Sequence, residues 1–150
     1  MSLLDPPPVK QEKSRAMAFT VAALVLVAAA VLWFTFRYYP EKRAAEHFFD
    51  ALVTGNTDQA YTLWKPGGNY LKKDFLADWS ETGYYGPVKS FKIMGAKTPR
   101  DSNVVEVRVA ISPFTPFPEE TDAEKSKKTK VVNLWIQPSD KAISFSPNSY

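Results

Sequence analysis

Cysteine and histidine, the residues that most often carry nucleophilic or metal-dependent chemistry, are nearly missing from this sequence. It contains no cysteine and one histidine, His47. The lack of thiols excludes disulfides, thiolate metal sites and cysteine nucleophiles. A single imidazole argues against a histidine-based metal site or a Ser-His-Asp triad within one chain, and His47 lies off the apolar row of its predicted helix. We therefore predict no catalytic residue, no metal site and no cofactor.

Two phenylalanines in a proline-rich connection are the clearest candidates for contact with a partner. The segment 112–130 begins Ser-Pro-Phe-Thr-Pro-Phe-Pro and continues with an acidic and then a basic run, which we expect to be solvated. A connection of this length is often functional or disordered, and its prolines favour an extended start. Phe114 and Phe117 either fold back onto their own sheet, contact a partner protein or enter a lipid surface.

One apolar segment dominates the N-terminal part of the chain. Residues 16–36 carry no charge, and only Thr20 and Thr35 are polar. As a helix this segment spans roughly 32 Å, which matches a hydrocarbon core of roughly 30 Å. Its Leu, Val and Phe side chains contribute on the order of −3 to −6 kcal/mol to insertion. We predict a single-pass transmembrane helix over 16–36.

A cleaved signal peptide is the alternative for this segment. Signal peptides have apolar regions of roughly 7–15 residues before a small-residue cleavage site, whereas here Ala28–Ala30 is followed by Val-Leu-Trp-Phe-Thr-Phe. That aromatic end suits a membrane interface. Basic residues are balanced on the two sides, so the tail-first layout decides the orientation. We predict an uncleaved signal anchor with the tail 1–15 in the cytoplasm and the domain 37–150 on the extracytoplasmic (periplasmic) side.

Small side chains recur along the predicted anchor. Ala16, Ala23 and Ala30 repeat every seven residues, and small residues let helices approach closely in lipid. This row predicts docking against another transmembrane helix, although alanine is also common in such segments for no specific reason.

The remaining chain changes its apolar period from four residues to two. Three helices are expected, the first from Pro40 to Gly55, a second from Thr57 and a third over 72–81. Four strands follow, over 88–96, 105–111, 132–136 and 143–145, and the turn at 138–141 pairs the last two as an antiparallel hairpin. Helices followed by a strand meander predict an α+β domain, with helices on one face of a curved antiparallel sheet.

The helical segment 44–64 carries a family resemblance. Its sequence, AAEHFFDALVTGNTDQAYTLW, resembles the opening of nuclear-transport-factor-two-like domains, which include ketosteroid isomerases and membrane-anchored bacterial modules. The resemblance covers the order of elements and about 20 residues of pattern, and it implies a cone-like α+β fold. It does not imply a function, because this fold supports enzymes, binders and scaffolds alike.

The isomerase-like members of that family use acids and tyrosines inside the cone. Tyr61, Asp78, Tyr84 and Tyr85 are the residues here that could point inward, although no spacing selects them and Asp78 is expected to be solvated. Tyr61, Trp64 and Trp79 are the possible lining of a pocket, while the alternative for Tyr61 and Trp64 is a place in the core.

These observations leave three function classes. The net charge of +3 is spread over the chain, which gives no nucleic-acid-binding patch and allows a mild attraction to membrane lipid. Our leading hypothesis is a non-enzymatic, membrane-anchored interaction module, an accessory or assembly subunit that binds other membrane protein subunits. The alternatives are a small apolar ligand-binding or sensing domain and a ketosteroid-isomerase-like lyase or isomerase.

Overall fold

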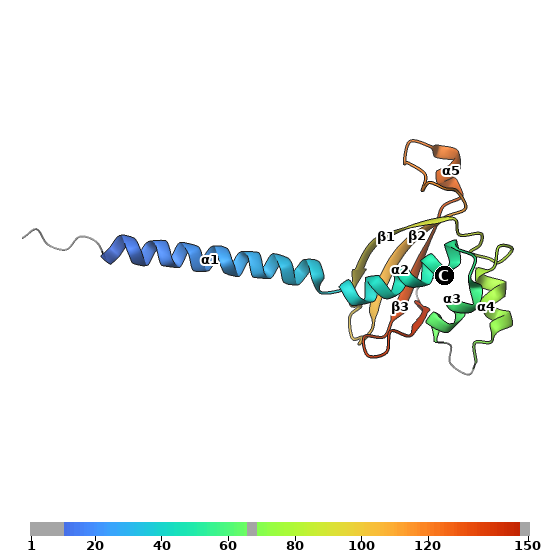
Figure 1. Cartoon of the computed structure of the whole chain (residues 1–150), viewed down its shortest axis with the longest axis horizontal. Helices are drawn as coiled ribbons and strands as arrows, with labels where there is room; N and C mark the ends of the chain where they lie inside the picture. Colours follow the sequence, from blue (N-terminus) through green and yellow to red (C-terminus); the bar gives the residue numbers. More distant parts are fainter. Residues whose placement is uncertain (1–10, 66–68, 148–150) are drawn as a thin grey trace, which may run out of the picture. The chain divides into compact units, whose positions relative to one another are not determined.

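The computed structural model describes residues 11–65 and 69–147 (Figure 1). The chain divides into two compact units, Met1–Arg37 and Tyr38–Tyr150. The first contains one long helix, α1 (Gln11–Phe36), and the second contains helices followed by a four-stranded antiparallel sheet. The fold class is therefore α+β, as predicted. The elements of the second unit are α2 (Tyr39–Val53), α3 (Thr57–Trp64), α4 (Lys72–Trp79), β1 (Ser90–Lys97), β2 (Val105–Ser112), α5 (Ala123–Lys127), β3 (Lys130–Ile136) and β4 (Ile143–Phe145).

Helix α1 is long and apolar enough to cross a membrane. It begins at Gln11, five residues before the predicted membrane span, which starts at Ala16 and stays a prediction. The residues before Ala16 are polar but include good helix formers, which continue the helix N-terminally; the first ten residues of the predicted tail lie outside the described residues. Inside the apolar stretch, the hydroxyls of Thr20 and Thr35 donate to carbonyls one turn earlier, at 2.9 and 2.7 Å. Neither hydroxyl therefore needs water.

The three helices that follow agree with the predicted order, and their ends are set by local capping. Pro40 lies in the first turn of α2, and Gly55, with φ of +78°, terminates it because glycine adopts this left-handed conformation without strain. The side chain of Asn56 accepts a hydrogen bond from Gln59 N at 3.1 Å and caps α3. Helix α4 ends at Trp79, two residues earlier than predicted.

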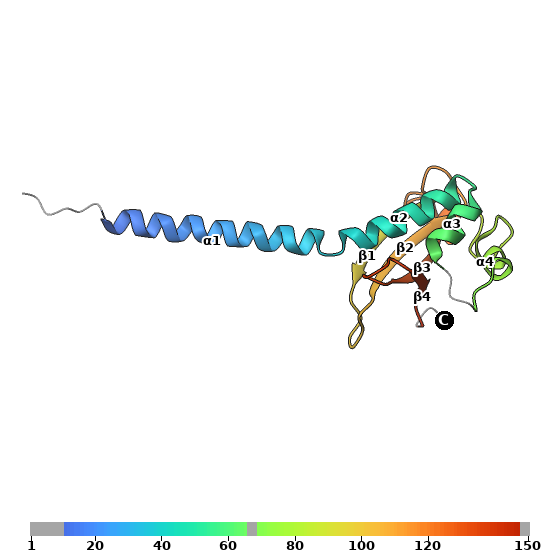
Figure 2. The same cartoon turned by 60° about the horizontal axis from the view of Figure 1, so that its bottom comes forward.

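The sheet has the strand order β1-β2-β3-β4, with every neighbouring pair antiparallel. Ile136 pairs with Ile143 across the last turn, which confirms the predicted hairpin. A register shift between Ile93 and Gly95 interrupts β1. Helix α2 crosses one face of this sheet, and α3 folds back beside α2. Helix α4 lies past the C-terminal end of α2 (Figure 2).

Aromatic rings fill the space between the helices and the sheet. Phe48 on α2 is fully buried, and its ring centroid lies 5.0 Å from that of Phe49 and 5.2 Å from those of Trp64 and Trp79. Trp79 in turn stacks on Phe145 of β4 with an interplanar angle of 5°. The core is thus a continuous network of rings that joins α2, α3 and α4 to the edge of the sheet.

The connection between β2 and β3 was predicted as an extended loop over 112–130, and the structure corrects this. Ser112 ends β2 and Lys130 begins β3, and the chain between them contains the short helix α5. The side chain of Asp122 accepts a hydrogen bond from Lys125 N at 3.2 Å. This N-cap stabilises a helical turn within a run of charged residues that lacks any apolar period.

Candidate functional site

The predicted pocket-lining residues lie in the core. Trp64 and Trp79 have 3% and 2% of their surface exposed, and their ring centroids are 5.8 Å apart. Tyr61 is half-buried, and its hydroxyl donates to the carbonyl of Tyr70 at 3.0 Å. All three side chains therefore pack within the domain, which agrees with the alternative that places Tyr61 and Trp64 in the core.

A tyrosine–carboxylate pair does occur at the edge of this core, but with a tyrosine that sequence reasoning missed. The Tyr70 hydroxyl donates to Asp78 Oδ2 at 2.6 Å, and Asp78 is half-buried rather than solvated as predicted. Burial and the neighbouring Asp78 carboxylate raise the pKa of Tyr70 well above its ordinary value. The phenol thus stays protonated and donates to Asp78, which fastens the segment before α4 to the helix.

The predicted partner-contact loop adjoins the sheet. Phe114 and Phe117 are both half-buried, and the amines of Lys125 and Lys128 each lie 5.8 Å from the centroid of the Phe114 ring. The Phe114 carbonyl also accepts a hydrogen bond from the Ser90 hydroxyl at 2.6 Å. The start of the connection is therefore attached to β1.

The alanine row lies on α1. Ala16, Ala23 and Ala30 are exposed along the helix, and a spacing of seven residues places them on one side of it. Docking of a second helix on this row remains a prediction.

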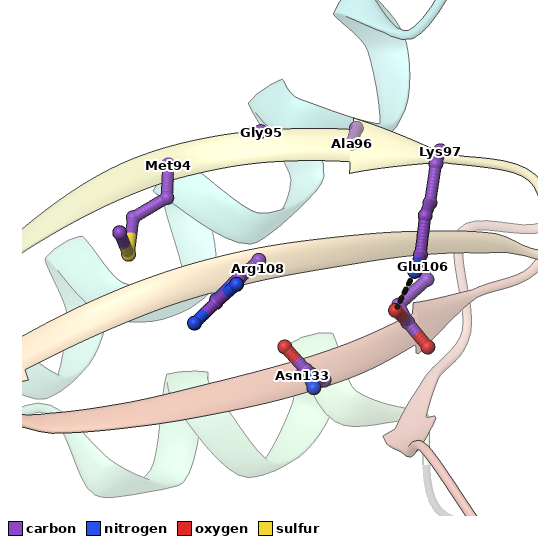
Figure 3. Close-up of a pocket in the computed structure, with 7 residues that line it drawn as sticks. All are labelled: Met94, Gly95, Ala96, Lys97, Glu106, Arg108 and Asn133. Atoms are coloured by element: carbon purple, nitrogen blue, oxygen red, sulfur yellow. Dashed lines mark ion pairs between the residues drawn. The ribbon is translucent and has the colours of Figure 1, made fainter. Parts of the chain in front are cut away.

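The face of the sheet away from α2 carries a hollow that the sequence did not reveal. Along β2, Val105, Val107 and Val109 point into the core, so the alternate residues Glu106 and Arg108 point to the opposite face. Here the surface is hollowed with a cavity volume of about 370 Å³ (Figure 3). The residues that line it come from three neighbouring strands, and they are Met94, Gly95, Ala96, Lys97, Glu106, Arg108 and Asn133.

Glu106 is the buried charge of this hollow, with 8% of its surface exposed. Its Oε2 accepts hydrogen bonds from Trp135 Nε1 at 3.2 Å and Ser146 Oγ at 3.0 Å, and its Oε1 lies 3.4 Å from Lys97 Nζ. Burial by itself would raise the pKa of Glu106, but the hydrogen bonds from Trp135 and Ser146 and the positive charge of Lys97 together lower it below the ordinary value. The carboxylate is thus charged and bound by three groups of its own domain.

We expect Glu106 to make the stability of the domain depend on pH. Because its pKa is lower in the folded than in the unfolded chain, its stabilising effect is complete above the unfolded value of about 4.3 and is lost as pH falls through the folded value. Glu106→Gln should lower the free energy of unfolding by about 1–3 kcal/mol at neutral pH. Urea unfolding of the full chain in detergent, followed towards about pH 3, should show this difference shrinking. A difference that stays constant over this range would contradict the prediction.

Arg108 occupies the middle of the hollow and projects from β2 between β1 and β3 (Figure 3). It is exposed, and no carboxylate in the described part of the chain forms an ion pair with it. Its neighbour on β1 is Gly95, where an added Cβ would meet no atom within 4 Å. A guanidinium beside open space can donate two parallel hydrogen bonds to a carboxylate.

Sequence reasoning used Glu106 and Arg108 only as the polar half of a strand pattern. The signal that distinguishes them is the cross-strand register, which brings Arg108 beside Gly95 and Asn133. Comparisons with protein-family models, with curated proteins and with solved structures gave no match. The likeness of segment 44–64 to nuclear-transport-factor-two-like domains therefore remains a prediction. The evidence that bears on function is the geometry of the hollow around Arg108, on the sheet face away from α2.

Proposed function

We propose that this protein is a non-enzymatic, membrane-anchored interaction module that serves as an accessory or assembly subunit of a larger membrane protein complex. In this proposal α1 spans the bilayer, and the second unit is a cone-like domain on the extracytoplasmic side. The sheet face that carries Arg108, away from α2, binds a polypeptide of the partner. The single observation that carries the proposal is the exposed Arg108 guanidinium, which has no carboxylate partner in the described chain and lies in a hollow.

The surroundings of Arg108 suit a polypeptide better than a small solute. Met94 beside the hollow is 54% exposed, and Val131 on the same face is 48% exposed. Interfaces commonly combine apolar anchors with an arginine, and a partner carboxylate would supply the missing counter-charge. We therefore expect the partner to contribute an Asp or Glu side chain, or a C-terminal carboxylate, flanked by apolar residues.

Two features favour an interaction module over the other function classes. The aromatic rings of Phe48, Trp64 and Trp79 occupy the interior that a ligand-binding cone would keep open. The buried carboxylate of the hollow, Glu106, already binds three donors of its own domain. That bonding supports a role for Glu106 in holding the strands together rather than in proton transfer.

Site-specific photo-crosslinking tests the proposed docking face. A photoreactive amino acid in place of Met94 should crosslink to one partner protein in intact membranes, through a peptide that contains an acidic residue. Arg108→Glu should reduce this crosslink by about tenfold or more, because a charge-assisted hydrogen bond of about 1.5–3 kcal/mol is replaced by repulsion. Gly95→Leu, which fills the hollow, should have a similar effect.

Arg100→Glu is the matched control. Arg100 is exposed on the turn between β1 and β2 and does not line the hollow, so the same change of charge there should leave the crosslink intact. Equal loss with both glutamate variants, or a crosslink that forms regardless of residue 108, would contradict docking at Arg108. Purification in mild detergent of a monomer without a bound subunit would contradict the proposed function as a whole.

A further inference from the structure

A second hollow lies at the N-terminal end of α2, and its floor is apolar. It is a groove with a cavity volume of about 410 Å³ between α2, the end of α3 and the turn that joins β3 to β4. Tyr39 at one end of it is 54% exposed. Its apolar lining comes from Tyr39, Pro40, Ala44, Leu63 and Ile143. An apolar lining favours an apolar occupant over water.

The groove begins close in sequence to the end of α1, and this proximity determines which apolar molecules can reach it. Tyr39 follows Phe36, the last residue of α1, after only Arg37 and Tyr38. Three residues of chain reach no further than about 11 Å. If α1 spans the bilayer, as in the proposed function on which this inference rests, this reach places Tyr39 within the interfacial layer of lipid headgroups or directly beside it.

The rim of the groove is basic. Its lining includes Arg43, Lys65 and Lys141, and none of the described lining residues is acidic. Arg43 pairs with Glu46 at 2.8 Å and Lys141 pairs with Glu41 at 2.9 Å.

Lys65 differs from these two cations, because its amine donates to the main-chain carbonyl of Asp140. No carboxylate of the described chain forms an ion pair with it. The Asp140 side chain accepts a hydrogen bond from Ala142 N at 3.0 Å. Lys65 is therefore the cation of the rim that remains available to an external anion.

We propose that this groove binds one anionic phospholipid, with an acyl chain along the apolar floor and the phosphate beside Lys65. The two parts of the site match the two parts of the phospholipid. The basic rim attracts its anionic headgroup, and the apolar floor is covered by its acyl chain. Such a lipid would hold the domain against the bilayer at a second point, separate from α1 and from the hollow at Arg108.

Photolabelling in liposomes tests the proposal. The full chain is reconstituted with phosphatidylcholine and a phosphatidylglycerol that carries a diazirine in one acyl chain, and the labelled peptides are identified by mass spectrometry. Label is expected on α1 and also on peptides that contain Tyr39–His47 and Ile143. Lys65→Gln should reduce the label on the second set about fivefold, the factor that one basic side chain contributes at an anionic surface. Ala44→Phe, which occupies the floor, should reduce it as well.

Two references separate the site from general lipid contact. Label on α1 should be equal in all variants, and Lys73→Gln, at an exposed lysine of α4 outside the groove, should leave the groove label unchanged. Label confined to α1, or groove label equally strong with a diazirine phosphatidylcholine, overturns the proposal while leaving the anchor in place. Absence of label on α1 overturns both the span and the lipid site. If the photoreactive residue at position 94 formed no crosslink to a partner while the groove was still labelled, the proposed function alone would be contradicted.

Discussion

Replacing Phe48 by alanine is expected to lower the free energy of unfolding of the domain by about 3–5 kcal/mol. Phe48 is fully buried, and its ring lies within 5.2 Å, centroid to centroid, of Phe49, Trp64 and Trp79. Its removal costs the transfer free energy of the ring and leaves a cavity, because three neighbouring large rings cannot collapse into the space. A loss of this size is a large part of the total stability of about 5–15 kcal/mol of a typical domain.

Urea unfolding of the full chain in detergent, followed by tryptophan fluorescence, measures this loss. Met94→Ala is the control, because Met94 is 54% exposed on the other face of the sheet, and exposed substitutions usually change stability by less than about 0.5 kcal/mol. If Phe48→Ala destabilised the domain no more than Met94→Ala does, the ring network would not be the core of the fold.

The elements with a strict apolar period were predicted closely from the sequence. The alternation of Val105, Val107 and Val109 identified β2, and a turn of polar residues between two short apolar runs identified the β3–β4 hairpin. A four-residue rhythm identified α2, which buries Phe48 and Phe49 as expected. These patterns suffice because burial on one side is itself what selects the helix or the strand.

Elements governed by polar contacts were predicted less well. Helix α5 has no buried residue, so no apolar period marks it, and it depends on the Asp122 cap. The part of α1 that precedes the predicted span, from Gln11 to Arg15, likewise has no apolar period and shows a helix only through the propensity of its residues.

The candidate sites required the register of the strands, which the sequence alone did not provide. Arg108 becomes notable only when Gly95 is its neighbour on β1, and that pairing depends on the register shift after Ile93. The apolar groove similarly combines Ala44, Leu63 and Ile143 from three elements that are distant in sequence. Phe114 and Phe117, which did stand out in the sequence, are half-buried, and the Phe114 ring lies beside two lysines of its own connection.

Two arginines in the middle of α1 are expected to release the protein from the membrane. Leu24 and Val27 are exposed on the described helix and lie near the centre of its apolar stretch. Each arginine at the centre of a span costs about 2.5–3.5 kcal/mol. The pair Leu24→Arg and Val27→Arg therefore cancels the roughly 3–6 kcal/mol that the apolar side chains contribute to insertion. After extraction of membranes at alkaline pH, the wild-type chain should sediment with the lipid and the variant should stay in the supernatant.

The pair Leu24→Ala and Val27→Ala separates the effect of charge from the loss of side-chain volume. Alanine keeps the helix uncharged and favours helix formation, so this control should sediment with the lipid as the wild type does. Arg37, which follows the last residue of α1, already places an arginine at that end, and a charge there lies at the interface and costs little. The position of the added charge, rather than its presence, is thus what decides release. An arginine pair at residues 24 and 27 that left the chain in the membrane fraction would mean that something other than the insertion of α1 holds the protein there.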